Sequence, residues 1–287
     1  MDNSQNLVES CSLLVVSCDA YSDLWCPFFT LLGRFWTDCP FPLYLGAGCK
    51  KYDYPKLATL SSACGRDWAG CVRDYLEDIP TPYVLMVLDD FFLRGPVRNA
   101  EILRCLGFAQ LNNAIQVRLI PRPGPTQRVF DEELIGECEC GLPYRLSTQA
   151  AIWDRLALIN LLRPGESIWE FEHSGNQRIL QLPKGFYATW RQVLPYQGVL
   201  AHHVIEKGKW IPHQKLLFGR KKVGCDFSQR ATLPVGQTFY CICAEVLAGI
   251  LGFLPWRVNA QIRRTLKRIL SPFIGKRMIS ASGQPSR

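Results

Sequence analysis

Two adjacent carboxylates follow the most apolar run in the first half of this 287-residue chain. Residues 83–88 read Tyr-Val-Leu-Met-Val-Leu, and Asp89 and Asp90 come directly after them. Neighbouring carboxylates repel each other unless a cation or a bound group compensates their charge. Oxygen ligands of this kind suit Mg²⁺ or Mn²⁺, which commonly bind together with substrate phosphates. The pair is therefore a candidate metal or phosphate site; a helix cap with an ion pair to Arg94 or Arg98 is the alternative.

A second pair of acids, Glu170 and Glu172, lies among aromatic residues in the segment 167–173. Side chains two positions apart point to the same side if the segment is extended. Aromatic neighbours can raise the pKa of a carboxyl group toward neutrality, which suits a general base. The segment is thus a candidate catalytic site, and an exposed turn with solvated acids is the alternative.

Further polar groups could serve a phosphorylated ligand. His202 and His203 are adjacent, and residues 207–210 read Lys-Gly-Lys-Trp. Asp19 ends the first apolar run and would lie beside Asp89 if their strands are neighbours; a turn cap is the alternative. Because the chain has neither a complete Gly-x-Gly-x-x-Gly motif nor a P-loop, nothing supports a nicotinamide or an ordinary ATP site.

The elements that must position these residues alternate between strand and helix. Apolar runs predict strands at 12–17, 41–45, 83–88 and 114–120, and helical spacing predicts helices at 23–33, 67–79 and 98–111. This alternation indicates an α/β fold with a doubly wound, mostly parallel sheet flanked by helices, in which the carboxyl ends of the strands face the ligand. Residues 121–141, which are rich in acids and open on a Pro/Gly loop, are expected to form a mobile excursion from the sheet, and a helix is expected at 154–162.

Composition narrows the class of protein. The chain is 48% hydrophobic and 20% charged, as expected of a globular protein rather than a disordered one. It has 13 cysteines, an odd number, and its first ten residues lack the positive region of a signal peptide, so we expect reduced thiols in the cytoplasm. No run of about 18 apolar residues predicts a transmembrane helix.

Charge divides the chain into a neutral body and a basic tail. Residues 1–245 hold equal numbers of acids and bases, whereas 246–287 contain eight basic residues and no acid. Apolar residues recur every three to four positions over 257–274, which predicts a basic amphipathic helix. We expect it to bind an anionic membrane surface; packing on the body and nucleic-acid binding are the alternatives, the latter without a supporting motif.

Several of these stretches together resemble a family. They are LLVVSCDAYSDLWCPFF (13–29), YVLMVLDDFFLRGPV (83–97), YRLSTQAAIW (144–153), SIWEFE (167–172) and KGKW (207–210). In this order they resemble bacterial sugar-nucleotide glycosyltransferases of the GT-A fold, and more narrowly a poorly characterised group from polysaccharide-biosynthesis loci. The resemblance covers about residues 12–212 and leaves out the tail.

The resemblance implies a role for each candidate residue. The donor would be bound by Ser17, Asp19, Asp89, Lys207, Lys209 and Trp210, and the acceptor by Tyr144, Arg145, Gln149 and Trp153. Asp90 would bind a divalent metal, Mn²⁺ or Mg²⁺, with His202 as a weaker candidate. The family motif is Asp-x-Asp, and Leu88 replaces its first acid here, which puts metal dependence in question. Glu170 or Glu172, with Glu170 preferred, would be the base.

The resulting hypothesis is a glycosyltransferase that moves a sugar from a nucleotide-diphosphate donor to a glycan or lipid-linked acceptor in surface-polysaccharide biosynthesis. Its donor half would span about 1–120, its acceptor half 121–245 and its tail 246–287, and it would lie on the inner face of the cell membrane with no nucleic-acid partner. A Mg²⁺-dependent phosphohydrolase and a membrane-bound scaffold without catalysis are the alternatives.

Overall fold

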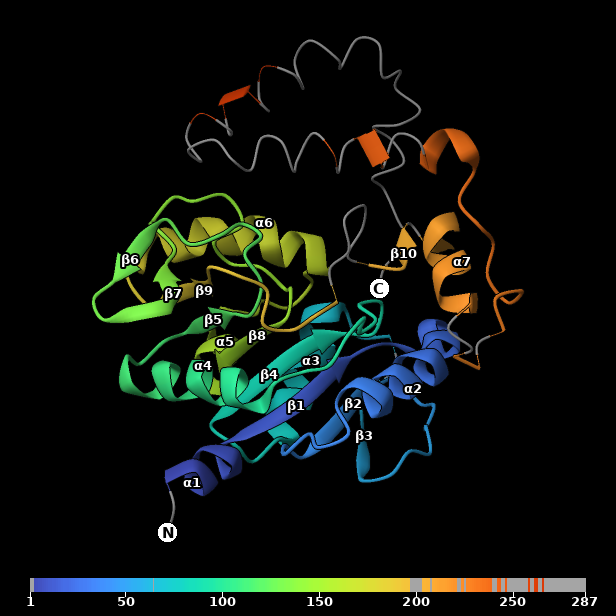
Figure 1. The fold of residues 1–287 in the computed structure, drawn as a ribbon, viewed down its shortest axis with the longest axis horizontal. Helices are drawn as coiled ribbons and strands as arrows, with labels where there is room; N and C mark the ends of the chain where they lie inside the picture. The colour runs from blue at the N-terminus through green and yellow to red at the C-terminus, as the bar shows by residue number, and fades with distance from the viewer. Residues whose placement is uncertain are drawn as a thin grey trace.

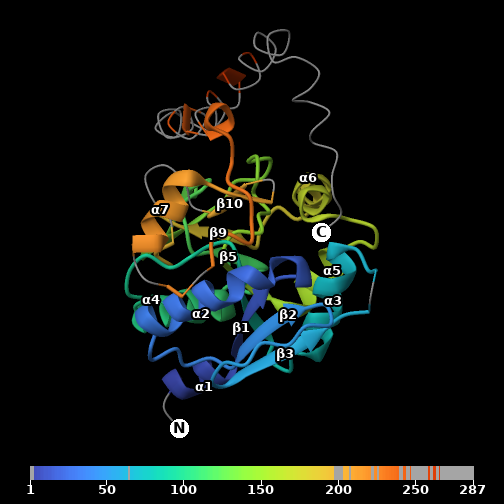
Figure 2. The ribbon, with the colours of Figure 1, turned by 90° about the vertical axis from the view of Figure 1, so that its right-hand side faces the viewer.

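A nine-stranded sheet with helices on both faces forms the body of the protein (Figures 1 and 2). The computed structural model describes residues 3–63, 65–196, 203–206, 208–220, 223–224 and 226–238, and single residues 242, 243, 246, 258, 261, 262 and 265. The strands lie in the order β3-β2-β1-β4-β8-β5-β9-β7-β6. Among these residues no helix is both long enough and apolar enough to cross a membrane.

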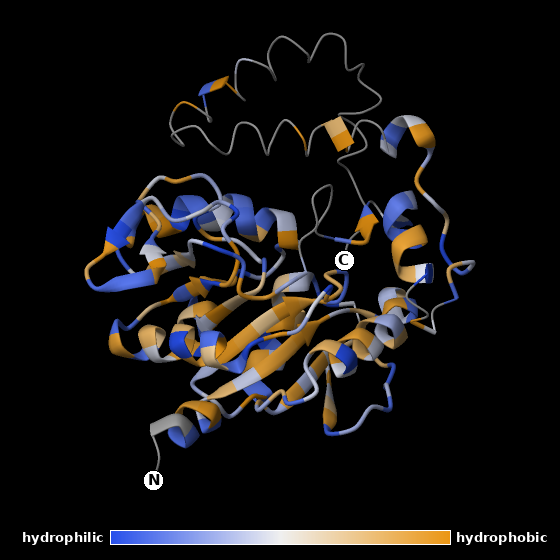
Figure 3. Cartoon of the chain, in the orientation of Figure 1, coloured by the Kyte–Doolittle hydropathy of each residue, from blue (hydrophilic) through white to orange (hydrophobic). Residues whose placement is uncertain are grey.

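The first half of the sheet is parallel. It comprises β1 (Cys11–Val16), β2 (Leu43–Ala47), β3 (Leu57–Ser61) and β4 (Tyr83–Leu88). All six residues of β1 are buried, and so are the last five of β4. Continuous apolar runs are typical of strands covered on both faces, and Figure 3 shows this apolar centre. The predicted strands at β1, β2 and β4 are confirmed, whereas β3, with no fully buried residue, was not predicted.

Helices cover both faces of this half. A short 3₁₀ helix, η1 (Asp19–Leu24), leads into α2 (Trp25–Phe35), and α1 (Asn3–Glu9), α3 (Trp68–Asp78) and α4 (Asn99–Leu111) complete the set. The Asp67 carboxylate caps α3 by accepting from the Gly70 amide at 2.9 Å. Val97, just before α4, donates its amide to the Phe35 carbonyl at 2.9 Å, so α4 lies on the same face as α2, with α3 on the opposite face (Figure 2).

The second half of the sheet is mixed. Strand β8 (Ala151–Asp154) runs antiparallel between β4 and β5 (Gln116–Arg118), and β9 (Phe186–Thr189) is parallel to β5. Strands β7 (Glu132–Glu137) and β6 (Gln127–Val129) complete the edge as an antiparallel hairpin. The predicted α/β class, with a central sheet flanked by helices, is confirmed, and its parallel part is the first half.

One prediction about the later part of the chain needs correction, the structure decides a conformation that was left open, and a third prediction falls outside the described residues. The segment 121–141 is no excursion, because its two strands extend the main sheet. Residues 168–173 are helical, within α6 (Ile168–Arg178), and Ser167, its N-cap residue, forms a capping box with Glu170. The predicted tail helix lies largely outside the described residues.

The remaining elements are α5 (Arg155–Leu161), η2 (Ile179–Gln181), β10 (Ile205–Glu206), β11 (Lys209–Trp210) and α7 (Pro212–Arg220). Strands β10 and β11 form a small separate hairpin. The Val204 amide donates to the Asp90 carbonyl at 2.9 Å, so this hairpin begins directly over the carboxyl end of β4. The C-terminal part of the described chain therefore covers the strand ends at which a ligand is expected.

Candidate functional site at the strand ends

The carboxyl ends of β1 and β4 bring two predicted donor-binding residues into contact. Val16 and Leu88 are partners in the parallel register, so the residues that follow them are neighbours. The Ser17 hydroxyl donates to Asp89 Oδ2 at 2.5 Å, and Trp25 Nε1 donates to the Ser17 oxygen at 2.6 Å. The condition set for Asp19, that its strand and the strand before Asp89 are neighbours, is met.

Asp89 and Asp90 are both buried, at 3% and 6% exposure. Phe91, the next residue, packs edge-on against Tyr196 with ring centroids 4.7 Å apart. The negative charge of Asp90 helps to raise the pKa of Tyr196, although burial of the phenol is the larger cause. The acidic pair is thus enclosed at the sheet edge by the chain around residue 196.

Asp19 fastens η1 to the loop after β2. Its carboxylate accepts from the amides of Gly48, Cys49 and Lys50 at 3.0, 2.8 and 3.1 Å. Burial acts to raise the pKa of Asp19, but these hydrogen bonds outweigh it and hold the pKa below its usual range. A Cβ at Gly48 would lie 2.8 Å from Asp19 Oδ2, so the close approach requires glycine there. The structure thus gives this carboxylate partners within the chain.

A polar cavity of about 450 Å³ opens beside Asp19. It is lined by Asp19, Ala20, Ser22, Asp23, Lys50, Gly208, Gln229, Arg230 and Ala231. The Lys50 ammonium donates to the Ser22 hydroxyl at 2.8 Å. Carboxylate, ammonium, guanidinium and hydroxyl groups together suit a charged ligand that carries many hydrogen-bonding groups.

Arg230 holds this cavity together from a distant part of the chain. Its guanidinium bonds to both Asp23 oxygens, at 2.6 and 3.0 Å, and lies 4.4 Å from the centre of the Tyr21 ring. It also donates to the Ala20 and Gly208 carbonyls at 2.9 and 3.0 Å. Burial acts to lower the pKa of Arg230, but the hydrogen bonds and charge of Asp23, with a smaller contribution from Asp89, raise it.

Sequence reasoning missed Lys50, Asp23 and Arg230. Arg230 and Asp23 are 207 positions apart, and no periodicity or motif connects them. The signal available was weak: Lys50 closely follows the predicted second strand, at the edge where a ligand was expected. These residues become a site only when the C-terminal segment folds over the sheet.

The predicted basic loop over the donor is partly described. Lys207 and His202 lie outside the described residues. Lys209 belongs to β11 and is half-buried, whereas Trp210 is fully buried and packs against Phe92 and Phe227, with ring centroids 6.4 and 4.9 Å away. The Trp210 ring therefore contributes to a packed aromatic cluster.

Of the four predicted acceptor residues, two are buried in the framework. Arg145 is 2% exposed and donates to the carbonyls of Cys138, Leu182 and Pro183 at 2.8, 2.6 and 2.6 Å, and burial lowers its pKa. Trp153 is fully buried inside β8.

The other two acceptor candidates lie differently. Tyr144 is 60% exposed and has a left-handed backbone, with φ 56°. Gln149 lies two residues before Ala151, the first residue of β8, which pairs with Met86. Because the pairing is antiparallel, the start of β8 lies at the carboxyl end of β4, the end that leads to the acidic pair. Gln149 is the acceptor candidate that the sheet register places at the strand ends.

The start of α6 reaches the same edge of the sheet. Phe171 packs on Trp68 in the first turn of α3, with ring centroids 5.4 Å apart, and the Glu166 carbonyl accepts from the Ala69 amide at 3.1 Å. Helix α3 follows β3, so its first turn lies at the carboxyl ends of the parallel strands. The candidate base segment therefore lies at the carboxyl ends of the parallel strands.

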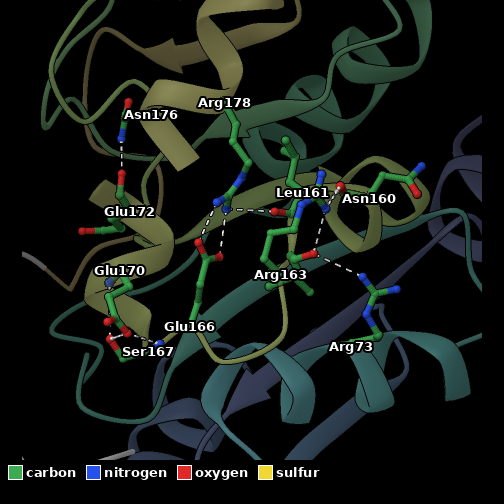
Figure 4. A network of polar contacts seen from close by, with 11 residues as sticks. Arg73, Asn160, Leu161, Arg163, Glu166, Ser167, Glu170, Glu172, Asn176 and Arg178 are labelled. Carbon is green, nitrogen blue, oxygen red and sulfur yellow. Dashed lines mark hydrogen bonds and ion pairs between the residues drawn. The ribbon is translucent and has the colours of Figure 1, made fainter. Parts of the chain in front are cut away.

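The two acids of this segment have different surroundings (Figure 4). Glu170 is exposed, and its Oε2 accepts from the Ser167 amide and hydroxyl at 2.8 and 2.7 Å; these bonds hold the pKa of Glu170 below its usual range. Glu172 is 8% exposed and faces the loop before β8. The two acids were expected to point to one side only if the segment is extended, and the helix does not meet that condition.

The acidic pair fits a divalent ion that arrives with phosphates. No group of three or more His, Cys, Asp or Glu side chains able to hold a metal occurs within the described ranges. Asp89 and Asp90 can offer one or two carboxylate ligands, and Mg²⁺ bound with substrate phosphates commonly takes no more from the protein. The donor set therefore suits Mg²⁺ or Mn²⁺ on a nucleotide rather than a metal held by protein alone.

Comparison with known proteins gives similarities in structure alone. No protein-family model matches the chain, and no curated protein sequence matches it. The structure is similar to that of S. aureus TarS 1-349, with a TM-score of 0.40, 13% identity and coverage of 85% of this chain and 72% of that one. It is also similar to the bifunctional IspDF from Campylobacter jejuni, with a TM-score of 0.38, 14% identity and coverage of 69% of this chain and about half, 52%, of that one. Similarities at this level assign no function.

Proposed function

We propose that this protein is a glycosyltransferase that uses a nucleotide-diphosphate sugar. The observation that carries the proposal is the contact between Ser17 and Asp89 at the adjoining ends of β1 and β4, beside a polar cavity of about 450 Å³. Ligands of open α/β sheets bind in the crevice at the carboxyl ends of the strands. The resemblance of the motifs to GT-A glycosyltransferases supports the same reading.

In this proposal the nucleoside diphosphate occupies the cavity between η1, the loop after β2, Gly208 and residues 229–231. Lys50 supplies a positive charge at its wall, and Arg230 shapes it by holding Asp23. Asp90, with Asp89 beside it, would hold Mg²⁺ or Mn²⁺, which when bound neutralises charge on the departing diphosphate.

The acceptor would enter from the side of Gln149 and the first turn of α6. Its hydroxyl oxygen forms a bond to the anomeric carbon of the sugar while the bond from that carbon to the diphosphate oxygen breaks. The hydroxyl proton passes to a carboxylate, and the nucleoside diphosphate leaves. We assign the base to Glu170 on accessibility, because its carboxylate is the one of the two that reaches solvent, although the hydrogen bonds from Ser167 lower its pKa.

A nucleotide panel tests the proposal. UDP, GDP, CMP, dTDP and ADP are each added with and without Mn²⁺, and the melting temperature of the full chain is followed. A ligand at about 100 times its Kd adds roughly 2.7 kcal/mol to native stability. We expect one diphosphate to stabilise the wild type with Mn²⁺, and the effect to disappear in Asp90→Asn.

The matched control is Asp131→Asn, at the exposed tip of the β6–β7 hairpin. Its backbone has φ 58°, a conformation that asparagine tolerates well, so this variant should respond to nucleotide like the wild type. Well-folded wild-type protein that no nucleotide stabilises would contradict the proposal. Sugar transfer from the stabilising nucleotide's sugar conjugates then identifies the donor.

We further propose that the acceptor is a glycan or a lipid-linked sugar at the inner face of the cell membrane. The support is the composition of 246–287, with eight basic residues and no acid. Removing residues 246–287 should abolish sedimentation with vesicles containing anionic lipid while nucleotide stabilisation persists. Unchanged sedimentation of the truncated chain would refute the membrane role.

A further inference from the structure

Two side chains of helix α6, one turn apart, hydrogen-bond to the loop before β8. Asn176 Oδ1 accepts from the Leu146 amide at 3.0 Å, and its Nδ2 donates to the Leu146 carbonyl at 2.8 Å. One turn earlier, Glu172 Oε1 accepts from the Thr148 amide at 2.7 Å, the Thr148 hydroxyl at 2.8 Å and the Ser147 hydroxyl at 3.1 Å. The loop therefore runs along the helix with its backbone held at two points.

The loop that α6 holds, residues 146–148, leads directly to the strand ends. Gln149 follows Thr148, and the Ala150 amide donates to the Tyr196 hydroxyl at 3.2 Å. Tyr196 in turn packs on Phe91, the residue after the acidic pair. The Leu119 amide donates to the Ala150 carbonyl at 2.9 Å, which fixes the same residue to the end of β5. Gln149 therefore stands between Thr148, which Glu172 holds, and Ala150, which is fixed at the end of β5, so its position depends on the loop that Glu172 holds.

The contacts of Glu172 are those of a residue that holds a loop. A carboxylate oxygen accepts about two hydrogen bonds through its lone pairs, and Glu172 Oε1 already has three donors. A general base must reach the proton that it removes. The Glu172 side chain is only 8% exposed, and it is buried against the loop before β8. Removing the Glu172 carboxylate would leave the Thr148 amide and two hydroxyl groups inside the protein without a hydrogen-bond acceptor, which lowers the stability of the fold.

We infer that Glu172 is a positioning residue: it fixes Ser147 and Thr148 so that Gln149 stands at the acceptor side of the strand ends and recognises a hydroxyl of the acceptor sugar. This inference rests on the proposed function. It separates the two acids of the segment, one acting on the substrate and the other on the loop.

The test compares Glu172→Gln, Glu172→Ala and Glu170→Gln in the full chain, with Glu133→Gln on an exposed position of β7 as the control. Steady-state transfer gives kcat and the KM for the acceptor at saturating donor, and hydrogen exchange gives the protection of the Thr148 amide. Glutamine keeps a carbonyl oxygen that can accept from Thr148, and alanine does not. A base loses about 10²–10⁴-fold in rate on removal.

We expect Glu172→Gln to keep kcat within about tenfold of the wild type. In Glu172→Ala the acceptor KM should rise and the protection of the Thr148 amide should fall, and only Glu170→Gln should show the loss of a base. If Glu172→Gln instead loses turnover by about 100-fold or more, as a base would, while Thr148 stays protected, the inference is overturned. Unchanged KM and protection in Glu172→Ala would overturn it as well.

Failure of the proposed function gives a different result. In that case the wild type neither binds a nucleotide diphosphate nor transfers sugar, and Gln149 has no acceptor to recognise, so the substrate part of the inference falls with it. The protection of Thr148 in Glu172→Ala then decides the positioning part alone.

Discussion

Replacing Arg230 by methionine should destabilise the protein by about 3 kcal/mol, the lower part of the range for breaking a buried ion pair by removing one partner. The Arg230 and Asp23 side chains are each only 12% exposed, and the pair is bidentate. Methionine keeps much of the aliphatic part of the side chain, so the loss of stability measures the contribution of the guanidinium group. Most of it arises because Asp23 is left as a carboxylate with little access to water.

Urea unfolding of the full chain measures this cost, and two further variants make the measurement specific. Arg66→Met removes an ion pair to Asp74 in which the Arg66 side chain is 46% exposed, so it should cost less than about 1 kcal/mol. The double variant Asp23→Asn with Arg230→Met should recover at least about 1 kcal/mol, because no unpaired charge is left behind. If Arg230→Met costs no more than Arg66→Met, Arg230 does not hold the cavity together in solution.

Three further predictions concern the same edge and the core. Ser17→Ala should cost about 1–3 kcal/mol in urea unfolding, because it removes a partner of buried Asp89; no change would mean that Asp89 finds another donor. The pKa of Asp19 is lowered on folding, so its contribution to stability is complete above the unfolded pKa and is lost as pH falls through the folded pKa. Asp19→Asn should therefore make the free energy of unfolding fall less steeply at acid pH. An unchanged dependence on pH would refute this. Burial raises the pKa of Cys11 to about 12, so at pH 8 iodoacetamide should modify exposed Cys49 and spare Cys11 in the native protein, as peptide mapping would show; equal labelling would contradict the burial of Cys11.

Local patterns were sufficient for β1, β2 and β4 in the parallel half of the sheet, whereas the partly exposed β3 was missed. The uninterrupted apolar runs of β1 and β4 could be read as buried strands, and Asp67 could be read as the start of α3. Once two such strands are parallel neighbours, the residues that follow them must meet. The contact between Ser17 and Asp89 is the direct consequence of that geometry.

The acidic segment shows where a local pattern is ambiguous. Alternating aromatic and acidic residues at 169–172 fit an extended strand as well as a helix. The capping box formed by Ser167 and Glu170, together with the packing of Phe171 on Trp68, selects the helix. In the helix Glu170 is exposed to solvent and Glu172 is buried. The residues next to each acid in the sequence are similar and do not predict this difference.

What the sequence by itself determined was the class of fold, the strands at its centre and the edge where chemistry is expected. Only the tertiary structure decided that β8 enters between β4 and β5, that Glu172 holds the Thr148 loop, and that Arg230 reaches Asp23 across 207 positions. The physical reason is range. Periodicity and caps act between residues a few positions apart and leave a trace in the sequence, whereas a contact between distant segments depends on how the whole chain closes around its core.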